Sequence, residues 1–305
     1  MTTTLLDSSR EPGRIKRKIA AYFALTKPRV IELLLVVTVP TMILAAGTIP
    51  NLWLVAATLI GGAASAGASG AFNCYIDRES DRLMKRTKNR PLVTGELSDR
   101  EALSFAWILG ISSVLWMLLF TNLLTAVLTL LAILLYVVLY SIVLKRRTEQ
   151  NIVWGGMAGC MPVLIGWAAV TNSLTWTPFI LFVIIFLWTP PHYWPLSMKY
   201  RDDYQAAGIP MLAVVRERGE VGLQVILYAW ATVAASLMLV PVAGMGVTYL
   251  VVAAVSGAWF IYETHRLYHL AIRNEQVSPM RVFHGSIGYL TILFLAIAID
   301  PLLPF

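Results

Sequence analysis

Residues 73–95 read NCYIDRESDRLMKRTKNRPLVTG, the longest polar run between two strongly apolar segments of the chain. Asn73, Asp77 and Asp81 follow one another at intervals of four. On an α-helix each such step drifts by only about 40°, so the three oxygen-bearing side chains line one face. Oxygen ligands of this kind suit a hard cation such as Mg²⁺, which takes one or two carboxylates together with water and substrate phosphate. The spacing therefore predicts a magnesium site formed by these three residues.

Basic side chains follow the acidic ones within the same stretch, at Arg78, Arg82, Lys85, Arg86, Lys88 and Arg90. A diphosphate needs this combination, because a metal can bind some of its oxygens while guanidinium groups bind others in pairs. The alternative is an ordinary charged segment in which Asp77, Asp81 and Lys85 form salt bridges along a helix. The D-x-x-x-D spacing alone does not separate the two interpretations. The position of the stretch in the chain is needed to decide between them.

The composition indicates a membrane protein. The chain has 305 residues, of which 58% are hydrophobic and 13% charged, whereas a soluble domain is about 25% charged. Its long apolar runs favour membrane-spanning helices, because a helix satisfies its own backbone hydrogen bonds within lipid. The net charge of +7 does not indicate a nucleic-acid partner, because the basic residues flank the apolar runs.

The apolar runs predict an all-α polytopic membrane protein with nine transmembrane helices. A basic N-terminal arm over 1–27, without a signal peptide, precedes a single membrane domain over 28–305. The predicted spans are 30–48, 53–76, 102–120, 123–144, 152–171, 177–198, 222–243, 247–268 and 283–300.

The charge distribution supports this count. With nine spans, all 24 Lys and Arg residues fall on the side of the N-terminus, and the only charge on the other side is Asp300. The positive-inside rule then places the N-terminus and the polar loops in the cytoplasm and the C-terminus outside. We expect a multi-pass protein of the bacterial cell (inner) membrane, and a mitochondrial inner membrane stays open as an alternative.

A second polar stretch, KYRDDYQAAGIPM at 199–211, lies on the same predicted side. Lys199 and Asp203 are four residues apart, and Asp202 adds another carboxylate. Because both polar stretches follow even-numbered spans, they can face each other across a bundle and share a metal-bound diphosphate. The alternative is a solvated loop.

Polar residues at two further span ends have two candidate roles each. Lys145 begins a basic triplet after the fourth span, with Tyr140 before it and Asn151 after it. This pattern fits either substrate binding or a positive charge that only fixes the topology. Glu32 lies inside the first span, where a carboxylate is costly, and it is either functional or paired with Arg29.

His192 lies within the sixth span, directly after Pro190 and Pro191. Two prolines remove backbone donors, so we expect the helical hydrogen-bond ladder to be broken there and the helix to kink. The histidine has three candidate roles, as an axial ligand of haem iron, a proton donor or a hydrogen-bonded core residue.

Two other groups indicate structure more than chemistry. His265 and His269 are four residues apart with Glu263 nearby, which fits a metal pair but fits a cytoplasmic helix end better. Cys74 and Cys160 lie in apolar helices outside any metal-binding spacing, so we expect small buried residues. Motifs for nucleotide hydrolysis and for serine or zinc hydrolases are absent from the sequence.

Four stretches resemble the UbiA-type intramembrane prenyltransferases, over about residues 25–295. They are NCYIDRESDRLMKRTKNRPL (73–92), LKRRTEQNIVWGGMAG (144–159), WTPPHYWPL (188–196) and DYQAAGIPML (203–212). The first indicates the family at large. The last two resemble its branch that acts on haem.

The resemblance implies nine helices around a central cavity, with farnesyl diphosphate and haem B as substrates and Mg²⁺ as cofactor. It assigns Mg²⁺–diphosphate to Asn73, Asp77 and Asp81, and charge neutralisation to Arg86 and Arg90. Further residues follow by match: Asp203 completes a second acidic site beside Lys199, and His192 belongs to the haem side. Many family members carry D-x-x-x-D in the second site, whereas this chain has Lys199 four residues before Asp203. The ligands of a second metal therefore stay open.

Three alternatives differ in substrate or class. A sibling prenyltransferase would act on an aromatic acid or another tetrapyrrole. A transporter would carry polar residues at mid-membrane and on both sides, unlike this chain. A CDP-alcohol phosphotransferase would carry D-G-x-x-A-R, which is missing. The sequence leaves open a homo-oligomer or an association with another enzyme of the haem pathway.

Overall fold

The computed structural model describes residues 12–304, without the side chains of residues 12, 14 and 29–35. Within this range the chain consists of helices joined by short loops and contains no β-strand, which confirms the predicted all-α class. The α-helices are α1 (Pro12–Leu25), α2 (Pro28–Ala46), α3 (Leu52–Leu83), α4 (Pro91–Thr94), α5 (Asp99–Phe120), α6 (Leu123–Leu134), α7 (Asn151–Gly155), α8 (Met157–Thr171), α9 (Trp176–Lys199), α10 (Arg201–Ala206), α11 (Leu212–Val215), α12 (Arg218–Leu237), α13 (Leu239–Ala243), α14 (Val247–Ile272) and α15 (Pro279–Ile299). A π-helix, η1 (Leu135–Leu144), continues α6, and a 3₁₀-helix, η2 (Asp300–Leu302), ends α15.

Eight helices in the described part of the chain are long and apolar enough to cross a membrane. They coincide with the second to ninth predicted spans, so the protein is an integral membrane protein. The first predicted span corresponds to α2, of which Val36–Ala46 is apolar and helical within the described side chains. The side chains of Arg29 and Glu32 lie outside the described residues, so the interpretation of Glu32 stays open.

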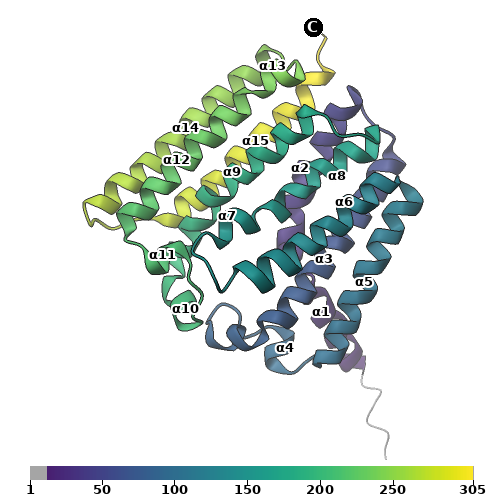
Figure 1. Cartoon of the computed structure of the whole chain (residues 1–305), viewed down its shortest axis with the longest axis vertical. Helices are drawn as coiled ribbons and strands as arrows, with labels where there is room; N and C mark the ends of the chain where they lie inside the picture. The colour runs from purple at the N-terminus through teal and green to yellow at the C-terminus, as the bar shows by residue number, and fades with distance from the viewer. Residues whose placement is uncertain (1–11, 305) are drawn as a thin grey trace, which may run out of the picture.

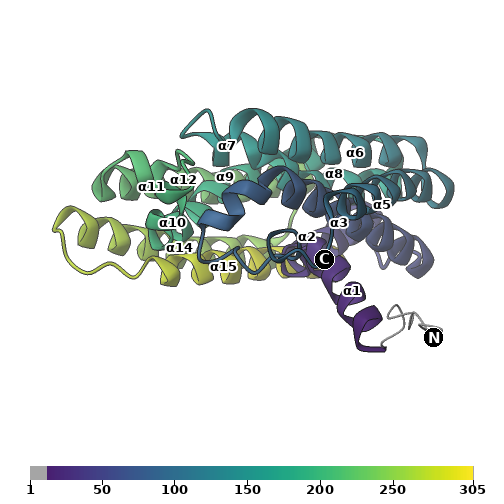
Figure 2. The same ribbon diagram turned by 90° about the horizontal axis from the view of Figure 1, so that it is seen from below.

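The long helices lie side by side, and the short polar elements gather at one end (Figure 1). This end carries α1, α4, α10 and α11, whereas α13 and the C-terminus lie at the opposite end. Figure 2 shows a flattened bundle, with α14, α15 and α2 on one side, α6, α7 and α12 on the other, and α1 projecting from it. The two polar stretches, separated by a hundred residues of chain, therefore meet at the same end.

Small residues allow several helices to approach closely. A Cβ atom at Gly61 in α3 would lie 2.7 Å from the sulfur of Met117 in α5. A Cβ atom at Gly257 in α14 would lie 2.7 Å from a methyl carbon of Val233 in α12. These glycines are therefore packing sites.

One helix contains three prolines, and another changes its geometry. Helix α9 runs from Trp176 to Lys199 through these internal prolines, in agreement with the sixth predicted span at 177–198, and the kink at Pro190 and Pro191 stays a prediction. Its neighbours α8, α12 and α15 pack along it, and such packing supports proline within a membrane helix. The fourth predicted span is helical throughout but changes from α to π geometry at Leu135.

Asp300 closes the end of the bundle opposite the polar elements. Its carboxylate accepts hydrogen bonds from the backbone N–H groups of Gly246 (2.6 Å) and Tyr249 (3.0 Å), at the start of α14. The first N–H groups of a helix have no partner within the helix, and a carboxylate also complements the positive end of the helix dipole. The side chain is nearly buried, with 6% of its surface exposed, so water cannot fully replace it.

Replacing Asp300 should therefore destabilise the protein. We expect Asp300→Ala to lower the free energy of unfolding by about 1–3 kcal/mol, because two buried N–H groups lose their acceptor. Asp300→Asn keeps one acceptor oxygen, so its free energy of unfolding should lie between that of Asp300→Ala and that of the unmodified protein. Thermal unfolding in detergent, followed by circular dichroism, measures both, and equal midpoints for all three proteins would contradict the capping role.

Candidate active site

The oxygen-bearing face predicted at residues 73–81 lies on one continuous helix. Because α3 extends to Leu83, Asn73, Asp77 and Asp81 all belong to its final turns. All three side chains are buried, with 3%, 0% and 1% of their surface exposed. The second predicted span ended at residue 76, whereas the helix continues to Leu83. The first residues of the polar stretch therefore belong to the membrane helix.

A basic side chain from a different element meets each of these three residues. Lys27, in the turn before α2, donates a hydrogen bond to Asn73 Oδ1. Two further contacts are ion pairs: Lys145 with Asp77 Oδ2, and Arg90 with Asp81 Oδ2 at 2.5 Å.

Each buried carboxylate keeps one oxygen without a partner. Asp77 Oδ1 and Asp81 Oδ1 are buried and have no hydrogen-bond partner among the described residues. An unpaired buried carboxylate oxygen is costly and rare, so it indicates a ligand that completes the site. The donor chemistry fits Mg²⁺, which takes carboxylate oxygens at two positions and fills the others with water or phosphate.

The π-helix η1 positions the contacts to this face. Its geometry shows in the bond from Lys145 N–H to the carbonyl of Tyr140, five residues earlier, at 2.9 Å. Ser141 Oγ accepts from Asn73 Nδ2 at 2.9 Å and donates to the carbonyl of Tyr136 at 2.9 Å. Isolated π-helical turns are typical of functional sites. Here the turn places Ser141 and Lys145 on neighbouring positions of the same face.

Arg86 connects the two predicted polar stretches. Its backbone N–H donates to Asp203 Oδ2 at 3.3 Å, and its guanidinium donates to the hydroxyl of Tyr204 at 3.1 Å. The hydroxyl of Tyr193 lies 3.1 Å from that of Tyr204. Burial alone would lower the pKa of Arg86, but its contacts with Tyr193 and Tyr204 outweigh burial and raise the pKa.

The second stretch joins this cluster only in part. Asp203 contacts Arg86 and is half-buried, whereas Lys199 and Asp202 are exposed. Within residues 12–304, no three His, Cys, Asp or Glu side chains lie close enough to hold one metal ion. Asp203 therefore does not join the two carboxylates of α3 as a third ligand of the same ion. Its place as a metal ligand stays a prediction.

Asn151 ties the basic triplet to the second stretch. Its amide nitrogen donates to the carbonyls of Thr148 at 2.7 Å and Pro210 at 3.5 Å. Asn151 is fully buried, and its Oδ1 has no partner among the described residues. Tyr140 contributes its backbone carbonyl to Lys145, and its ring lies 5.5 Å from that of Tyr136.

His192 lies between two aromatic rings on the side of α9 that faces α15. Its ring stacks on Trp188 at 4.2 Å and on Phe283 at 4.6 Å. Nδ1 lies 2.8 Å from the hydroxyl of Ser286, and that hydroxyl itself donates to the carbonyl of Phe283 at 2.7 Å. Nδ1 is therefore the donor in this pair, which leaves the lone pair on Nε2.

The structure gives His265 and Glu263 partners other than a metal. His265 Nδ1 lies 2.9 Å from the carbonyl of Ile261 in the preceding turn of α14. Both oxygens of Glu263 are bound by Arg281, at 2.6 and 2.7 Å. A helix end is thus the better interpretation. Cys74 and Cys160 are free and buried, as expected.

Sequence reasoning missed three of these contacts. Lys27 precedes a proline and adopts a left-handed φ of 54°, which directs the chain sharply between α1 and α2. Ser141 carried no signal because the change to π geometry has no sequence signature in this run. The hydroxyl of Tyr204 had only its place beside Asp203 to suggest a role.

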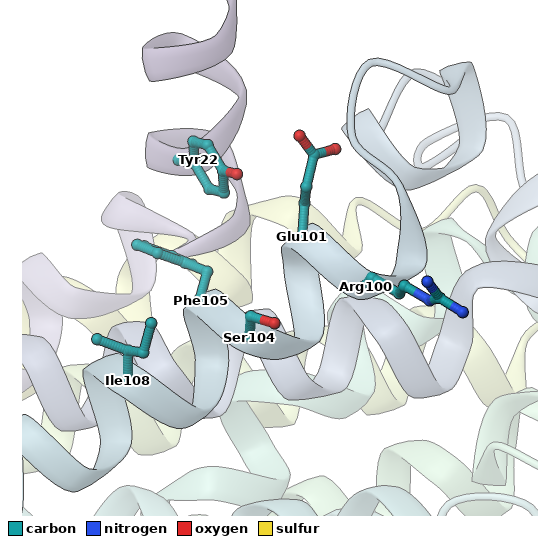
Figure 3. A pocket seen from close by; sticks show the side chains of 6 residues that line it. All are labelled: Tyr22, Arg100, Glu101, Ser104, Phe105 and Ile108. Carbon is teal, nitrogen blue, oxygen red and sulfur yellow. The ribbon is translucent and has the colours of Figure 1, made fainter.

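Two cavities are described, and neither is lined by the oxygens of α3. One of about 370 Å³ lies between α1 and α5 (Figure 3). The other, of about 430 Å³, is apolar and lined by α14 and α15. The central cavity that the resemblance implied thus stays a prediction.

The fold is similar to that of solved UbiA-type structures. The similarity to a digeranylgeranylglyceryl phosphate synthase has a TM-score of 0.76, with 18% identity over 93% of this chain and 98% of the other. A UbiA homologue from Aeropyrum pernix K1 gives 0.71, with 19% identity over 90% and 98%. A homologue from Archaeoglobus fulgidus bound to DMAPP and Mg²⁺ gives 0.62, with 17% identity over 91% and 99%.

Sequence relatives are much closer. The chain is 72% identical to a protoheme IX farnesyltransferase of Leifsonia xyli subsp. xyli, over 98% of this chain and 99% of the relative. It is 67% identical to a protein of the same name from Clavibacter michiganensis subsp. michiganensis, over 97% of each. The model of the UbiA prenyltransferase family matches residues 34–287. With its buried acidic face on α3 and this match over most of its length, the chain belongs to the UbiA prenyltransferase family.

Proposed function

We propose that the protein transfers a farnesyl group from farnesyl diphosphate to a vinyl group of haem B, which yields haem O and diphosphate. The observation that carries the proposal is the pair of unpartnered carboxylate oxygens of Asp77 and Asp81. The other oxygen of each carboxylate is paired with a basic side chain, Lys145 or Arg90. The choice of haem as the acceptor is supported by relatives of 67–72% identity that bear the name protoheme IX farnesyltransferase.

The diphosphate site has a defined division of roles. Asp77, Asp81 and Asn73 would hold one Mg²⁺, and Asp203 would contribute to a second metal site on the opposite side. When bound, Mg²⁺ would supply positive charge to the departing diphosphate. Arg86 and Arg90 add fixed positive charge to the same leaving group, because guanidinium groups pair with phosphate oxygens.

Lys145 and the polar residues around it complete the substrate side. Lys145 neutralises Asp77 in the absence of substrate and is close enough to the same oxygens to contact a bound phosphate. Asn151 holds the loop that follows Lys145 against the second stretch, and its free Oδ1 is available to a substrate donor. Lys199, at the exposed end of α9, would contribute charge at the mouth of the site.

The transfer breaks the allylic carbon–oxygen bond, the π bond of the vinyl group and one O–H bond of water, and it forms one carbon–carbon and one carbon–oxygen bond. The bond between the allylic carbon and the diphosphate oxygen breaks, and its electron pair leaves with diphosphate. A vinyl carbon of haem B forms the new carbon–carbon bond. Water then adds to the adjacent carbon and releases a proton. The aromatic faces of Tyr140 and Tyr193 would stabilise the intermediate cation, and the apolar helices exclude water until the carbon–carbon bond has formed.

His192 is assigned to the haem side of the site. With Nδ1–H bound to Ser286, the ring keeps its orientation and offers Nε2 to an electron acceptor. Such a second hydrogen bond is typical of histidines that bind a metal. The stacking by Trp188 and Phe283 limits ring rotation.

The membrane arrangement belongs to the same proposal. We assign nine transmembrane helices, namely α2 in addition to the eight spans described above. Residues 1–27 would form a cytoplasmic arm and residues 28–305 one domain. The N-terminus and the active-site loops would face the cytoplasm and the C-terminus the other side of the cell membrane. The location of all 24 basic residues on one predicted side supports this orientation.

The decisive experiment uses purified protein in nanodiscs with haem B, farnesyl diphosphate and Mg²⁺. We expect mass spectrometry to find a haem heavier by one farnesyl and one hydroxyl group, and EDTA to abolish it. Turnover of the diphosphate with an aromatic acid in place of haem would instead indicate the sibling class. No consumption of diphosphate with any acceptor would contradict the transferase and favour the transporter.

Removing one carboxylate should abolish the first step. We expect Asp77→Asn or Asp81→Asn to lower kcat by roughly 100-fold or more, because the site loses charge that stabilises the leaving group. Asp202→Asn, at an exposed carboxylate of the second stretch, is the matched control and should keep its activity. Near-normal turnover of either α3 variant, at unchanged Mg²⁺ dependence, would show that the metal assignment is wrong.

Removing the imidazole of His192 should weaken the binding of haem, which accepts the farnesyl group, and not the binding of farnesyl diphosphate, which supplies it. We expect His192→Ala to weaken haem binding, read as a loss of the Soret shift on titration with haem B, while the affinity for farnesyl diphosphate stays unchanged. Ser286→Ala leaves the imidazole but frees its orientation, so it should give a smaller loss. An unaltered haem spectrum in His192→Ala would remove this residue from the haem side.

A further inference from the structure

Helix α1 exposes a continuous apolar stripe. Ile15, Ile19 and Phe23 follow one another at intervals of four, and they expose 59%, 64% and 63% of their surface. The opposite side of the helix is covered by the protein, since Ala21 and Leu25 are buried. Because the stripe faces away from the bundle, the described part of the chain leaves it uncovered.

The helix is firmly attached to α5 on its covered side. The ring of Tyr22 lies 5.0 Å from that of Phe105, and Lys18 forms an ion pair of 2.5 Å with Glu101. Figure 3 shows Tyr22 of α1 facing Phe105 of α5, in the cavity whose lining changes from polar at Glu101 to apolar at Ile108. This change along a membrane-spanning helix marks the level of the bilayer surface, so α1 lies at that level.

The charge of α1 complements an anionic surface. Its sequence, PGRIKRKIAAYFAL, contains four basic residues and no acidic one. Lys16 and Arg17 are exposed. Helix α1 ends at Leu25 and α2 begins at Pro28. Because this connection is so short, α1 has to stay close to the bilayer surface that α2 enters. Apolar stripes with basic flanks are typical of helices that lie in the headgroup region of anionic membranes.

The turn after α1 reaches the candidate active site. The backbone oxygens of Leu25 and Thr26 lie so close to α3 that a Cβ atom at Gly70 would be 3.0 Å from each. The next residue, Lys27, donates to Asn73, three residues further along α3. The position of α1 thus determines where the ammonium group of Lys27 lies.

We propose that α1 is a binding surface for anionic phospholipid, and that its seating on the bilayer holds Lys27 at the oxygen-bearing face of α3. The second half rests on the proposed function, because it treats that face as the diphosphate site. Loss of anionic lipid would then weaken substrate binding without removing any group that contacts the reacting atoms.

The first test locates the stripe and does not depend on activity. Because Cys74 and Cys160 are buried, a thiol-reactive fluorophore can be placed on Ile19→Cys, with Lys16→Cys as the control on the polar side of α1. In nanodiscs of phosphatidylcholine with phosphatidylglycerol, we expect nitroxide-labelled lipids to quench the label at 19 more than the label at 16. Equal quenching would overturn the lipid-binding surface, as would energy transfer between copies labelled at 19, which would indicate a dimer.

The second test measures the coupling. We expect KM for farnesyl diphosphate to rise roughly fivefold in phosphatidylcholine alone, as expected for about one basic contact with anionic lipid, at unchanged kcat. Ile19→Glu should give the same rise in the mixed lipid. Ile49→Glu is the matched control, because Ile49 exposes 67% of its surface against 64% for Ile19 but lies far from α1 in the chain. It should leave KM unchanged.

A third variant separates the two halves of the proposal. Gly70→Ala should displace the Leu25–Thr26 turn and raise KM, while the label at 19 stays quenched by lipid. If the stripe is in the bilayer but neither Ile19→Glu nor lipid composition alters KM, the coupling to Lys27 is wrong. If no variant or lipid supports farnesyl transfer, the proposed function fails, whereas the quenching result still decides whether α1 binds the bilayer.

Discussion

Two ion pairs of buried carboxylates, Lys145 with Asp77 and Arg90 with Asp81, set the condition for everything around them. A carboxylate removed from water at the end of an apolar bundle costs several kcal/mol unless a charge and hydrogen bonds compensate it. Each carboxylate here has its cation but only half of its hydrogen bonds. An arrangement optimised for stability alone would satisfy both oxygens. The unfilled half is therefore best explained as a place for a ligand that brings its own positive charge.

The fold supplies the cations from separate parts of the chain. Lys145 follows the π-helix, and Arg90 precedes α4. Their convergence depends on all polar connections lying at one end of the bundle, as Figure 1 shows for α4, α10 and α11. Since the helices are apolar along most of their length, the basic side chains that pair with these carboxylates come from this end. The same separation would suit a substrate that joins a hydrophobic chain to a charged diphosphate.

The sequence predicted the helical class, eight of the spans as the structure has them, and the shared face of Asn73, Asp77 and Asp81. These predictions succeeded because hydropathy and helical spacing are local properties. Contacts between distant segments, such as Arg86 with Asp203 and Tyr204, could be expected only as a general approach of two loops. The change to π geometry at Leu135 depends on neighbouring helices, which local patterns do not contain.

The contacts of Asn73 explain why a lysine before the first long helix matters for a site on the third. An amide has one oxygen and two N–H donors, and here Lys27 takes the oxygen while Ser141 accepts from the nitrogen. Metal binding through the same oxygen would have to compete with Lys27 or displace it toward the phosphates. Burial lowers the pKa of Lys27, and the nearby carboxylates of Asp77 and Asp81 oppose part of that shift. A diphosphate that draws the ammonium group away from Asn73 would free the amide oxygen for the metal, so substrate and metal would favour each other's binding.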